Sequence, residues 1–518
     1  MKVNSILRIF KFILLGFIFT EGKAQFYNLP GDYFNSLLTE KTLAEKDSSI
    51  HPGIKPYISF YSAKYNHRAD THKIFKYITE DQFLDKVFFD HLIHLKPKNR
   101  KFFIAADPIL NFELGRDAED TLFRKLYTNT RGFIVSGTAG RKVYFETMFA
   151  ENQSLFPNYI ESMSRASLTV PGQGRWKVYN TRGFDYAFSS GFFSWQPFKF
   201  LNIQAGHGKH KIGNGYRSLL LSDNSFHYPF IRITQQYLKG RIQYTNMYAS
   251  FMNLTSASTT YPSHTEPLFQ KKAAAFQYLS INFTKWLNLG FFQGLIWQVP
   301  NQKNKQSFEW QYFNPVIYSN LAFYGLNNKN NIVAGADLNL KITRKISLYG
   351  QIMADDLSNN NSIGNGWGWQ AGIKYFDAFT LNNLFLQAEI NDVTEGSYLS
   401  PVTTYTANQS YSHYNQNLAF TPGFGREIIF IADYKYKRMF VNAKYNNQYF
   451  TYHLYPLFKN DIVNFQLGYT INPSYNACIS AGVMYRSQDY FGFNISNNKT
   501  AYLYLSFKTG FYNKYYDF

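Results

Sequence analysis

Two stretches near the C-terminal end alternate strictly between apolar residues and small or polar residues. They cover residues 463–471 and 477–485, and the sequence Asn-Pro-Ser at 472–474 marks a turn between them. A period of two is the signature of a β-strand with two different faces. The pair therefore predicts a β-hairpin with one apolar face, and this pattern constrains the fold more than any other feature.

The same alternation recurs upstream in pairs of segments joined by short turns. The pairs are 275–283 with 287–297, 332–342 with 346–354, and 428–434 with 441–445, and a final strand covers 501–507. Alternation fits a soluble sandwich, in which the apolar face is buried. It equally fits a membrane barrel, in which the apolar face meets lipid.

Several features favour the membrane barrel. The alternating segments are about ten residues long, which suits a tilted membrane strand better than the usual five or six residues of soluble strands. Short turns alternate with long polar stretches such as 356–365. The chain ends with Tyr516 and Phe518, which resemble the recognition end of outer-membrane barrel proteins. Aromatic residues gather at strand ends, as membrane girdles require; these are Tyr434, Tyr436, Tyr445, Tyr449 and Phe450.

The composition agrees with this interpretation. The chain has 51 Phe and 42 Tyr, and 17% of its residues are charged, against about 25% in typical soluble domains. After the N-terminus, no segment approaches the roughly 18 uninterrupted apolar residues of a spanning helix. Since helices and closed barrels are the structures that satisfy every backbone group in lipid, such an exported chain is either a secreted soluble β-protein or a transmembrane barrel, and the strand features above favour the barrel.

We therefore predict an all-β fold, a transmembrane antiparallel β-barrel over residues 111–518 in the cell outer membrane. At roughly 22 to 26 residues per strand and connection, it has about 16–18 strands. A lumen of that width has to be filled or to conduct.

The N-terminal region carries two other signals. Residues 1–24 read as a secretory signal peptide, with Lys2, Arg8 and Lys11 before an apolar core and small residues near a cut after Ala24. Residues 25–110 are expected to form a periplasmic segment with a small helical element, because apolar residues recur at helical spacing within 32–47 and 83–95.

The net charge of +19, or +16 without residues 1–24, suggests acidic partners. An exported protein meets little nucleic acid, so none is expected as a partner. Basic residues at lumen positions such as Lys341 and Lys435 are candidates to face lipopolysaccharide phosphates or an acidic polysaccharide. The alternative is that they solubilise the loops and the lumen.

The stretch from Gly206 to Asp223 interrupts the alternation with four glycines and a cluster of polar residues. The glycines permit an unusual backbone path, such as a loop folded into the lumen. One interpretation is a polar loop that binds sugar hydroxyls or carboxylates; the other is a structural plug. Two histidines three residues apart, without a carboxylate pair, are weak evidence for a metal, and we predict no metal and no cofactor. The candidate ligands are His207, Lys209, His210, Lys211, Arg217 and Asp223.

A second candidate site is a ligand-contacting rim formed by Arg131, Glu151 and Gln153 in loops punctuated by glycine and proline. The alternative is that these are ordinary surface connections. The sequence has no Gly-x-Ser-x-Gly motif and no grouping that indicates a catalytic triad, so we do not expect an enzyme.

Four blocks of the sequence together match a known pattern. They are Gly206–Asp223 continuing to Tyr228-Pro229, with Gly215–Asp223 the most specific part, Glu151–Gln153 with Phe156-Pro157, Val170–Gly174, and Asp107-Pro108. These blocks resemble a family of Bacteroidota outer-membrane proteins, the RemB-like gliding-motility proteins, which look related to the Wzi-type capsule-assembly barrels. The resemblance implies a large surface-exposed barrel that acts in gliding or holds exopolysaccharide at the cell surface.

Together these features predict a non-catalytic outer-membrane barrel that acts in gliding motility or in attachment of capsule or exopolysaccharide. Its expected partners are membrane lipid, lipopolysaccharide, an acidic polysaccharide, and the gliding or secretion machinery. The alternatives are a porin or substrate-specific channel and, as a third reading, a barrel hydrolase.

Overall fold

The computed structural model describes residues 37, 40–42, 44, 50–58, 86–95 and 102–518. Within the last range it leaves out 123, 141, 257–268, 300–308, 327–329, 356–365, 400–408, 453–454, 492–497 and 511–513. The predicted signal peptide (1–24) and the polar stretch 356–365 lie outside the described residues.

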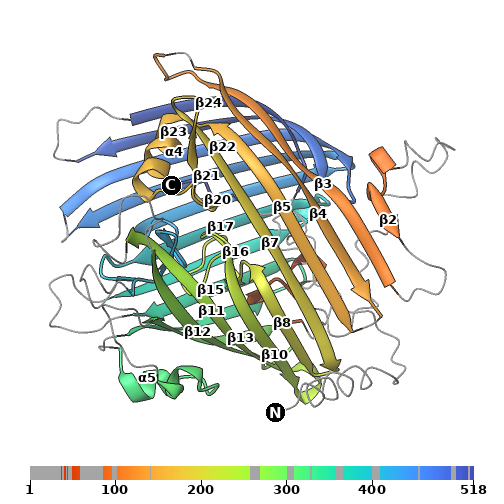
Figure 1. Cartoon of the computed structure of the whole chain (residues 1–518), viewed down its shortest axis with the longest axis vertical. Coiled ribbons are helices and arrows are strands. Elements are labelled where there is room, and N and C mark those ends of the chain that lie inside the picture. The colour runs from red at the N-terminus through yellow and green to blue at the C-terminus, as the bar shows by residue number, and fades with distance from the viewer. Residues whose placement is uncertain are drawn as a thin grey trace, which may run out of the picture.

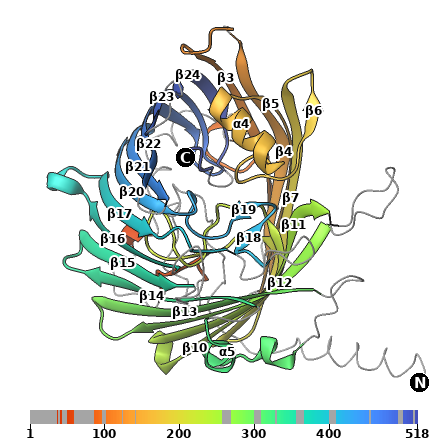
Figure 2. The same ribbon diagram turned by 90° about the vertical axis from the view of Figure 1, so that its left-hand side faces the viewer.

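The described chain forms a closed barrel of 18 antiparallel strands, in which the first long strand pairs with the last (Figures 1 and 2). The fold class and the predicted hairpins are confirmed. The strands are β3 (Phe102–Asp117), β4 (Leu126–Ala139), β5 (Val143–Leu155), β7 (Gly183–Phe198), β8 (Leu201–Gly208), β10 (Tyr228–Tyr237), β11 (Ile242–Ser256), β12 (Phe269–Asn282), β13 (Leu287–Gln298), β14 (Asn331–Lys341), β15 (Ile346–Ala354), β16 (Trp367–Phe376), β17 (Leu384–Val393), β20 (Gly425–Tyr436), β21 (Met439–Tyr452), β22 (Tyr455–Asn472), β23 (Ala477–Tyr490) and β24 (Asn498–Lys508).

Shorter elements accompany the barrel strands. β2 (Ile93–Leu95) pairs with β3, and β6 (Lys177–Tyr179) pairs with β7. β1 (Ile54–Lys55) pairs with β9 (Lys211–Ile212), and β18 (Ser412–His413) pairs with β19 (Gln416–Asn417). The helices are α4 (Asn158–Ser167), α5 (Ser319–Tyr324), η1 (Leu238–Gly240), η2 (Trp310–Phe313) and η3 (Ala378–Thr380).

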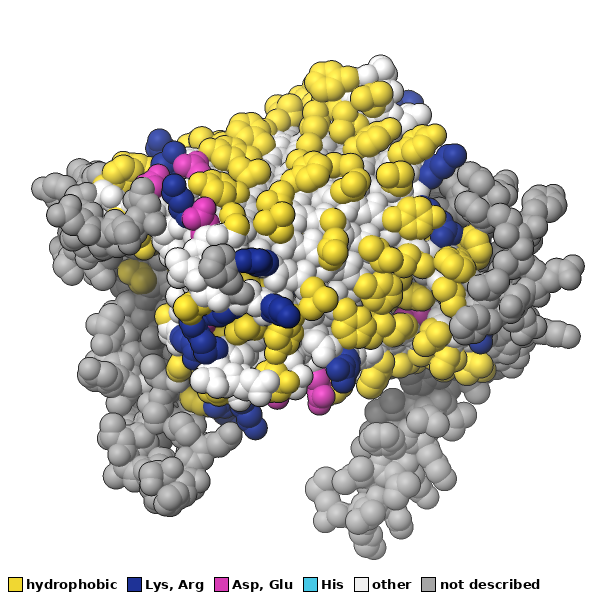
Figure 3. Space-filling model, turned by 90° about the horizontal axis from the view of Figure 1, so that it is seen from above, with side chains coloured by type: hydrophobic (Ala, Val, Ile, Leu, Met, Phe, Trp, Pro, Cys, Tyr) yellow, Lys and Arg dark blue, Asp and Glu magenta, His cyan; other side chains and the backbone are white. Residues whose placement is uncertain are grey.

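The two faces of the wall have opposite chemistry. Long polar side chains such as Gln351, Glu389 and Asn446 point inward and are at most 3% exposed. Apolar side chains on the outer face, such as Leu114 and Ile352, are 71% and 63% exposed. Figure 3 shows hydrophobic side chains spread over one outer face, with charged side chains gathered toward its edges. In a soluble protein the apolar side chains are buried and the polar side chains are exposed. The opposite arrangement seen here is the one that a wall surrounded by lipid requires, so the barrel spans a membrane.

The strand ends distinguish the two sides of the membrane. One end of the barrel has short turns, among them 283–286, 342–345 and 473–476, and the other carries most of the long connections. In outer-membrane barrels short turns face the periplasm and long loops face outside. We refer to these as the turn end and the loop end of this outer-membrane barrel.

The predicted aromatic girdle is confirmed in part. Tyr434 and Tyr436 lie near one end of β20 and Tyr449 near one end of β21, and they are between 36% and 57% exposed on the outer face. Tyr445 is 37% exposed on the same face but stands in the middle of β21, away from the strand ends. The assignment of Phe450 to the girdle is wrong. Its side chain is 7% exposed and stacks on Phe458 at 4.3 Å between ring centroids, because its position in β21 points into the lumen.

The N-terminal segment is partly helical. Residues 37, 40–42 and 44 are helical, within the predicted helix 32–47. Helical residues 86–88 give way to a strand at 93–95, where helix was expected. The reason is the stagger of the wall: β24 pairs with β3 from Asn111 onward, so the earlier part of β3 offers a free edge, and β2 pairs there. In the described part of the chain, no helix combines the length and hydropathy needed to cross a bilayer.

The boundary between residues 25–110 and 111–518 stays a prediction. The structure places the start of β3 at Phe102 and puts residues 50–57 inside the barrel, where β1 pairs with β9.

Candidate functional site

Residues 209–227, which connect β8 to β10, fold back into the lumen, and we call them the plug loop. The loop begins with β9, after which Gly213 adopts a φ of +138°, a conformation that favours glycine. The ammonium group of Lys211 donates hydrogen bonds to the carbonyl oxygens of Gly215 and Tyr216, at 2.9 and 2.7 Å. Lys211 therefore holds the turn of its own loop together.

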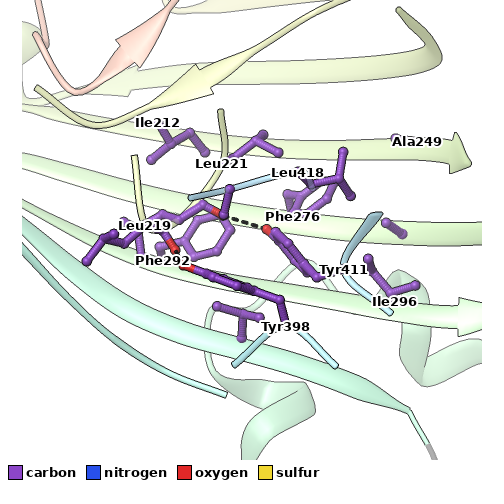
Figure 4. Packing of buried hydrophobic residues seen from close by; sticks show 14 of the residues in the cluster. Ile212, Leu219, Leu221, Ala249, Phe276, Phe292, Ile296, Tyr398, Tyr411 and Leu418 are labelled. Carbon is purple, nitrogen blue, oxygen red and sulfur yellow. Dashed lines mark hydrogen bonds between the residues drawn. The ribbon is translucent and has the colours of Figure 1, made fainter. Parts of the chain in front are cut away.

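An apolar cluster packs the centre of the plug loop against the wall (Figure 4). Leu219, Leu220 and Leu221 have no exposed surface. The hydroxyl groups of Tyr398 and Tyr411, from the connection between β17 and β20, donate to the carbonyl oxygens of Leu219 and Leu220 at 2.8 and 2.6 Å. The wall contributes Phe251, Phe276, Phe292, Val333 and Met353, among others. Two loops distant in sequence thus form one core inside the barrel.

Wall side chains also hold the backbone of the plug loop. The carboxylate of Glu389 accepts from the N–H groups of Tyr216 and Arg217, at 2.6 and 3.0 Å. The amide of Gln351 accepts from the N–H of Leu219 at 2.8 Å and donates to the carbonyl oxygen of Ile212 at 3.2 Å. These inward polar groups replace the partners that a buried irregular backbone would otherwise lack.

Replacing Gly213 with alanine is expected to destabilise the plug loop by about 2–4 kcal/mol, since it strains the backbone and disrupts two buried hydrogen bonds. A Cβ at Gly213 would lie 2.2 Å from the amide nitrogen of Gln351. The control is Gly140→Ala, which also has a positive φ (+61°) but meets nothing within 4 Å. Urea unfolding in detergent measures both; equal losses would contradict the role given to Gln351.

Arg217 is the electrostatic centre of the plug. Its guanidinium group binds both carboxylate oxygens of Glu427 on β20, at 3.0 and 2.8 Å. It also contacts the carboxylate of Asp517 at 3.2 Å and donates to the carbonyl oxygen of the same residue at 2.8 Å. All three residues are at most 1% exposed. Burial alone would raise the pKa of Asp517, but Arg217 and Lys444 together lower it to about 2.

The C-terminal segment lies inside the lumen. β24 ends at Lys508, and residues 514–518 pack among the plug loop, the wall and α4. The hydroxyl of Tyr159 on α4 donates to the carbonyl oxygen of Tyr516 at 2.8 Å, and Arg486 donates to that of Phe518 at 3.0 Å. Tyr516 and Phe518, which resemble the recognition end of outer-membrane barrel proteins, thus lie beyond the last strand and pack inside the lumen, and a recognition role for them stays a prediction.

The N-terminal segment meets the plug at the turn end. The carboxylate of Glu40 lies between the ammonium groups of Lys55 and Lys374, and Lys41 binds Asp377 in the turn after β16 at 2.8 Å. Burial opposes ionisation of Glu40, but Lys374 and Lys55 lower its pKa to about 2. The described helical residues are thus fixed to the barrel at its periplasmic mouth.

The structure brings together four of the six predicted ligands of the Gly206–Asp223 stretch. Lys209 donates to the carbonyl oxygen of Gly172 at 2.7 Å, and Asp223 accepts from the hydroxyl of Tyr515 at 2.8 Å. Lys211 binds the carbonyl oxygens within its own loop, and Arg217 binds the carboxylates of Glu427 and Asp517. Burial lowers the pKa values of Lys209 and Lys211 to about 8. These four side chains hold the plug in place, and their binding of sugar stays a prediction.

The other two predicted ligands have different surroundings. His207 lies at the end of β8, and its Nδ1 is 2.8 Å from the carbonyl oxygen of Ser189. His210 is buried, with its ring edge-on to that of Phe230 at 4.3 Å. Among the described residues, no group of three or more His, Cys, Asp or Glu side chains is arranged to hold a metal ion.

The second candidate site lies elsewhere. Arg131 on β4 and Glu151 on β5 are register partners, and both are exposed. The alternation places them, and the half-buried Gln153, on the outer wall near the loop end. They do not meet the plug, and a ligand-contacting role for them stays a prediction.

The loop end also carries a cluster of basic side chains around α4. Arg124, Arg165 and Arg182 share the buried carboxylate of Glu161, at 3.2, 3.1 and 3.3 Å. Arg165 and Arg182 are 39% and 44% exposed. Exposed Arg175 and Lys177 follow in the same connection. The connection 156–182 contains four basic residues and one acidic residue, so it presents positive charge to the outside.

Sequence reasoning missed several residues of the plug: Glu427, Glu389, Gln351 and Asp517. The signal for the first three was their position, since each is a long polar residue on the inward face of an alternating strand. Asp517 gave no such signal, because it lies beyond the last strand.

No protein-family model and no curated protein matches this chain. Among solved structures it is similar to Wzi of Escherichia coli, described as an outer-membrane protein involved in group 1 capsule assembly and as a carbohydrate-binding β-barrel. The sequence identity is 10%, the match covers 77% of this chain and 84% of that one, and the TM-score is 0.49. OccAB2 of Acinetobacter baumannii matches with 12% identity, 79% and 98% coverage and a TM-score of 0.44. OpdK, an outer-membrane protein of Pseudomonas aeruginosa, matches with 11% identity, 78% and 98% coverage and a TM-score of 0.45.

Proposed function

We propose that this protein is a non-catalytic, non-conducting outer-membrane barrel that holds an acidic polysaccharide at the cell surface. The observation that carries the proposal is the plug, which occupies the middle of the lumen. Its charged groups, such as Arg217, bind protein partners, and its apolar groups pack against the wall. A solute pathway would need polar groups that face water. A surface-attachment role needs a rigid wall that presents a binding rim to the outside.

Among the described residues, four parts of the chain contribute to the plug: residues 50–57, the plug loop, the described part of the connection between β17 and β20, and residues 514–518. The wall residues that face them, such as Glu427, Asn391 and Gln448, have no exposed surface. Such dense packing supports a barrel that is closed at rest.

The basic cluster around α4 supports an acidic ligand. Three guanidinium groups share the carboxylate of Glu161, and only Arg124 has a second carboxylate among these contacts, that of Asp120 at 2.6 Å. The cluster therefore keeps an excess of positive charge. Arginine binds carboxylates with two parallel hydrogen bonds, which suits the uronic acids of exopolysaccharides. A role in gliding motility would then follow from holding surface polymer.

The test measures conductance and binding on the same purified protein. In planar bilayers the wild type is expected to show no stable channel. In pull-down with a polyuronate and with neutral dextran, it is expected to bind the polyuronate, and binding should weaken in high salt. A variant with glutamine at Arg165, Arg175, Lys177 and Arg182 should lose at least about tenfold in affinity, given several charge-assisted contacts.

The matched control removes four exposed basic residues from the turn end: Lys239, Arg344, Lys345 and Lys437. It should bind polyuronate like the wild type. Equal losses in the two variants would mean that net charge alone attracts the polymer. Steady ion flow through the wild type would overturn the proposal and make the protein a porin.

A further inference from the structure

The connection between β13 and β14 lies on the outside of the barrel. Its described residues 309–326 contain η2 and α5, which lie against the outer wall (Figures 1 and 2). An apolar cluster joins the two layers, with Tyr312 on the segment packed against Trp297, Leu295 and Ile332 of the wall. Tyr312 and Trp297 stack at 4.7 Å between ring centroids. We call residues 309–326 the outer strap.

The wall beneath the outer strap breaks the apolar pattern of the outer face. Asn246, Gln277 and Gln293 are successive register partners on β11, β12 and β13, so they share one face. That face is the outer one, since the residues on either side of Gln277, Phe276 and Tyr278, belong to the core inside the barrel. Gln293 stands at the middle of the 12-residue strand β13, well away from both membrane surfaces. Unpaired amides at that depth would be costly in lipid.

The polar wall residues bind the backbone of the outer strap. Gln277 donates to the carbonyl oxygen of Asn314 at 2.8 Å, and Gln293 accepts from the N–H of Leu321 at 3.0 Å. Two tyrosines of the wall also bind the strap backbone. The hydroxyl of Tyr248 donates to the carbonyl oxygen of Phe313 at 3.1 Å, and the hydroxyl of Tyr244 donates to the carbonyl oxygen of Pro315. The wall thus supplies hydrogen-bond partners for the irregular backbone of the strap, which lipid could not supply.

The opposite side of the outer strap is apolar. Trp310, Val316 and Phe323 are 83%, 61% and 71% exposed. The sequence from Trp310 to Tyr324 contains no charged residue, and Glu309 at its start accepts a hydrogen bond from the hydroxyl of Tyr324. The strap therefore restores the apolar surface that the wall lacks at this point.

We propose that the outer strap lies in the membrane, with its exposed apolar side chains in contact with lipid acyl chains. Lipid is the expected neighbour of the strap because the strap lies on the outer face of the wall, where the surrounding apolar side chains already contact lipid. Its polar groups point to the wall and its apolar groups point away, as lipid requires and water does not. The connection thus leaves the loop end and returns down the outside of the barrel.

Site-directed spin labelling tests the proposal. The single cysteine, Cys478, is buried and is first replaced by alanine. Labels are then attached at Val316→Cys and Phe323→Cys in protein reconstituted into phosphatidylcholine vesicles. Two reference labels bracket them: Ile352→Cys on the lipid-facing wall, 63% exposed, and Leu122→Cys in the β3–β4 connection, 65% exposed. Heat-modified gel mobility confirms that each variant folds.

Collisions with oxygen report lipid, and collisions with a water-soluble nickel chelate report water. Labels at 316 and 323 are expected to match the Ile352 label, with an oxygen-to-nickel ratio several times that of the Leu122 label. Values that match the Leu122 label would overturn the proposal by placing the strap in water. Low accessibility to both reagents would also overturn it, because the strap would then be covered by protein, such as a second copy of the chain.

A second variant tests the hydrogen bonds to the wall. Gln293→Leu removes the acceptor of the Leu321 N–H and is expected to increase the mobility of the label at 323. The control Gln466→Leu removes a lumen-facing glutamine that donates to Ser480 on the other side of the barrel, and it should leave that mobility unchanged. An unchanged spectrum in both variants would contradict the role of Gln293.

Discussion

Replacing Arg217 with methionine is expected to destabilise the plug by about 3–5 kcal/mol, because it leaves two buried carboxylates without their partner. Glu427 would keep hydrogen bonds from Asn446 and Gln448, at 2.7 and 2.8 Å, but no cation. Asp517 would keep Lys444 at 2.7 Å. The plug loop and the C-terminal segment should therefore separate from the wall before the barrel itself unfolds. In planar bilayers the variant is expected to conduct where the wild type is silent.

The control for this experiment is the neighbouring surface pair. Arg426 binds Asp392 at 2.7 Å, but its side chain is 60% exposed, so Arg426→Met should cost at most about 1 kcal/mol and open no channel. A second variant, Arg217→Met with Glu427→Gln, removes one of the uncompensated charges and should recover part of the stability. A silent Arg217→Met protein with wild-type stability would contradict the role of this residue as the centre of the plug.

Acidification from pH 7.5 to pH 5 is expected to weaken the plug through its buried histidines. Burial lowers the pKa values of His210 and His227 well below 6.5 and that of His413 to about 3. His413 accepts from the N–H of Met252 at its Nδ1, so its Nε2 donates to the carbonyl oxygen of His227; each distance is 3.1 Å. The neutral ring satisfies both contacts, and a second proton would face an N–H group.

Protonation of these buried histidines destabilises the plug because their pKa values are lower in the folded protein than in the unfolded chain. A histidine whose folded pKa lies below its unfolded value of 6.5 binds fewer protons when folded, so its contribution is complete above pH 6.5. It is lost as the pH falls toward the folded pKa. For His413, whose folded pKa is about 3, the slope within that window is about 1.4 kcal/mol per pH unit, or about 2 kcal/mol by pH 5. His210 and His227 change the stability in the same direction. The paired carboxylates of Glu40 and Asp517 act in a lower window, below about pH 4.5.

Urea unfolding midpoints at pH 7.5 and pH 5 measure this effect. A His413→Gln variant keeps hydrogen-bonding capacity without titrating, so its midpoint should change less with pH than that of the wild type. The control is His94→Gln, which replaces a histidine that is 38% exposed, and its midpoint should change as much as that of the wild type. Identical pH dependence in all three proteins would exclude His413 as a contributor.

Much of the barrel could be predicted because alternation is a local property. Residues 463–485 specify a hairpin whatever surrounds them, since the period of two fixes which side chains share a face. The contacts that fill the barrel are not local. Arg217 and Glu427 are 210 residues apart, and nothing in either neighbourhood specifies the other. Arg217 was recognised as unusual, but its partners could not be named.

The outer strap illustrates a different limit. Gln277 and Gln293 fall on the apolar face of their alternating segments and appear as isolated exceptions in the sequence. An exception of this kind indicates that something covers the wall, but the covering segment has no alternation of its own. The same holds for residues 514–518, whose aromatic residues imitate a strand end while they pack inside the lumen.

The plug is assembled from both sides of the membrane. The plug loop enters the lumen from the loop end, whereas the C-terminal segment enters from the turn end after β24. Arg217 and Asp517 meet between them, so one ion pair ties a segment anchored outside to a segment anchored in the periplasm. This ion pair therefore holds together two segments of the plug that enter the barrel from opposite sides of the membrane.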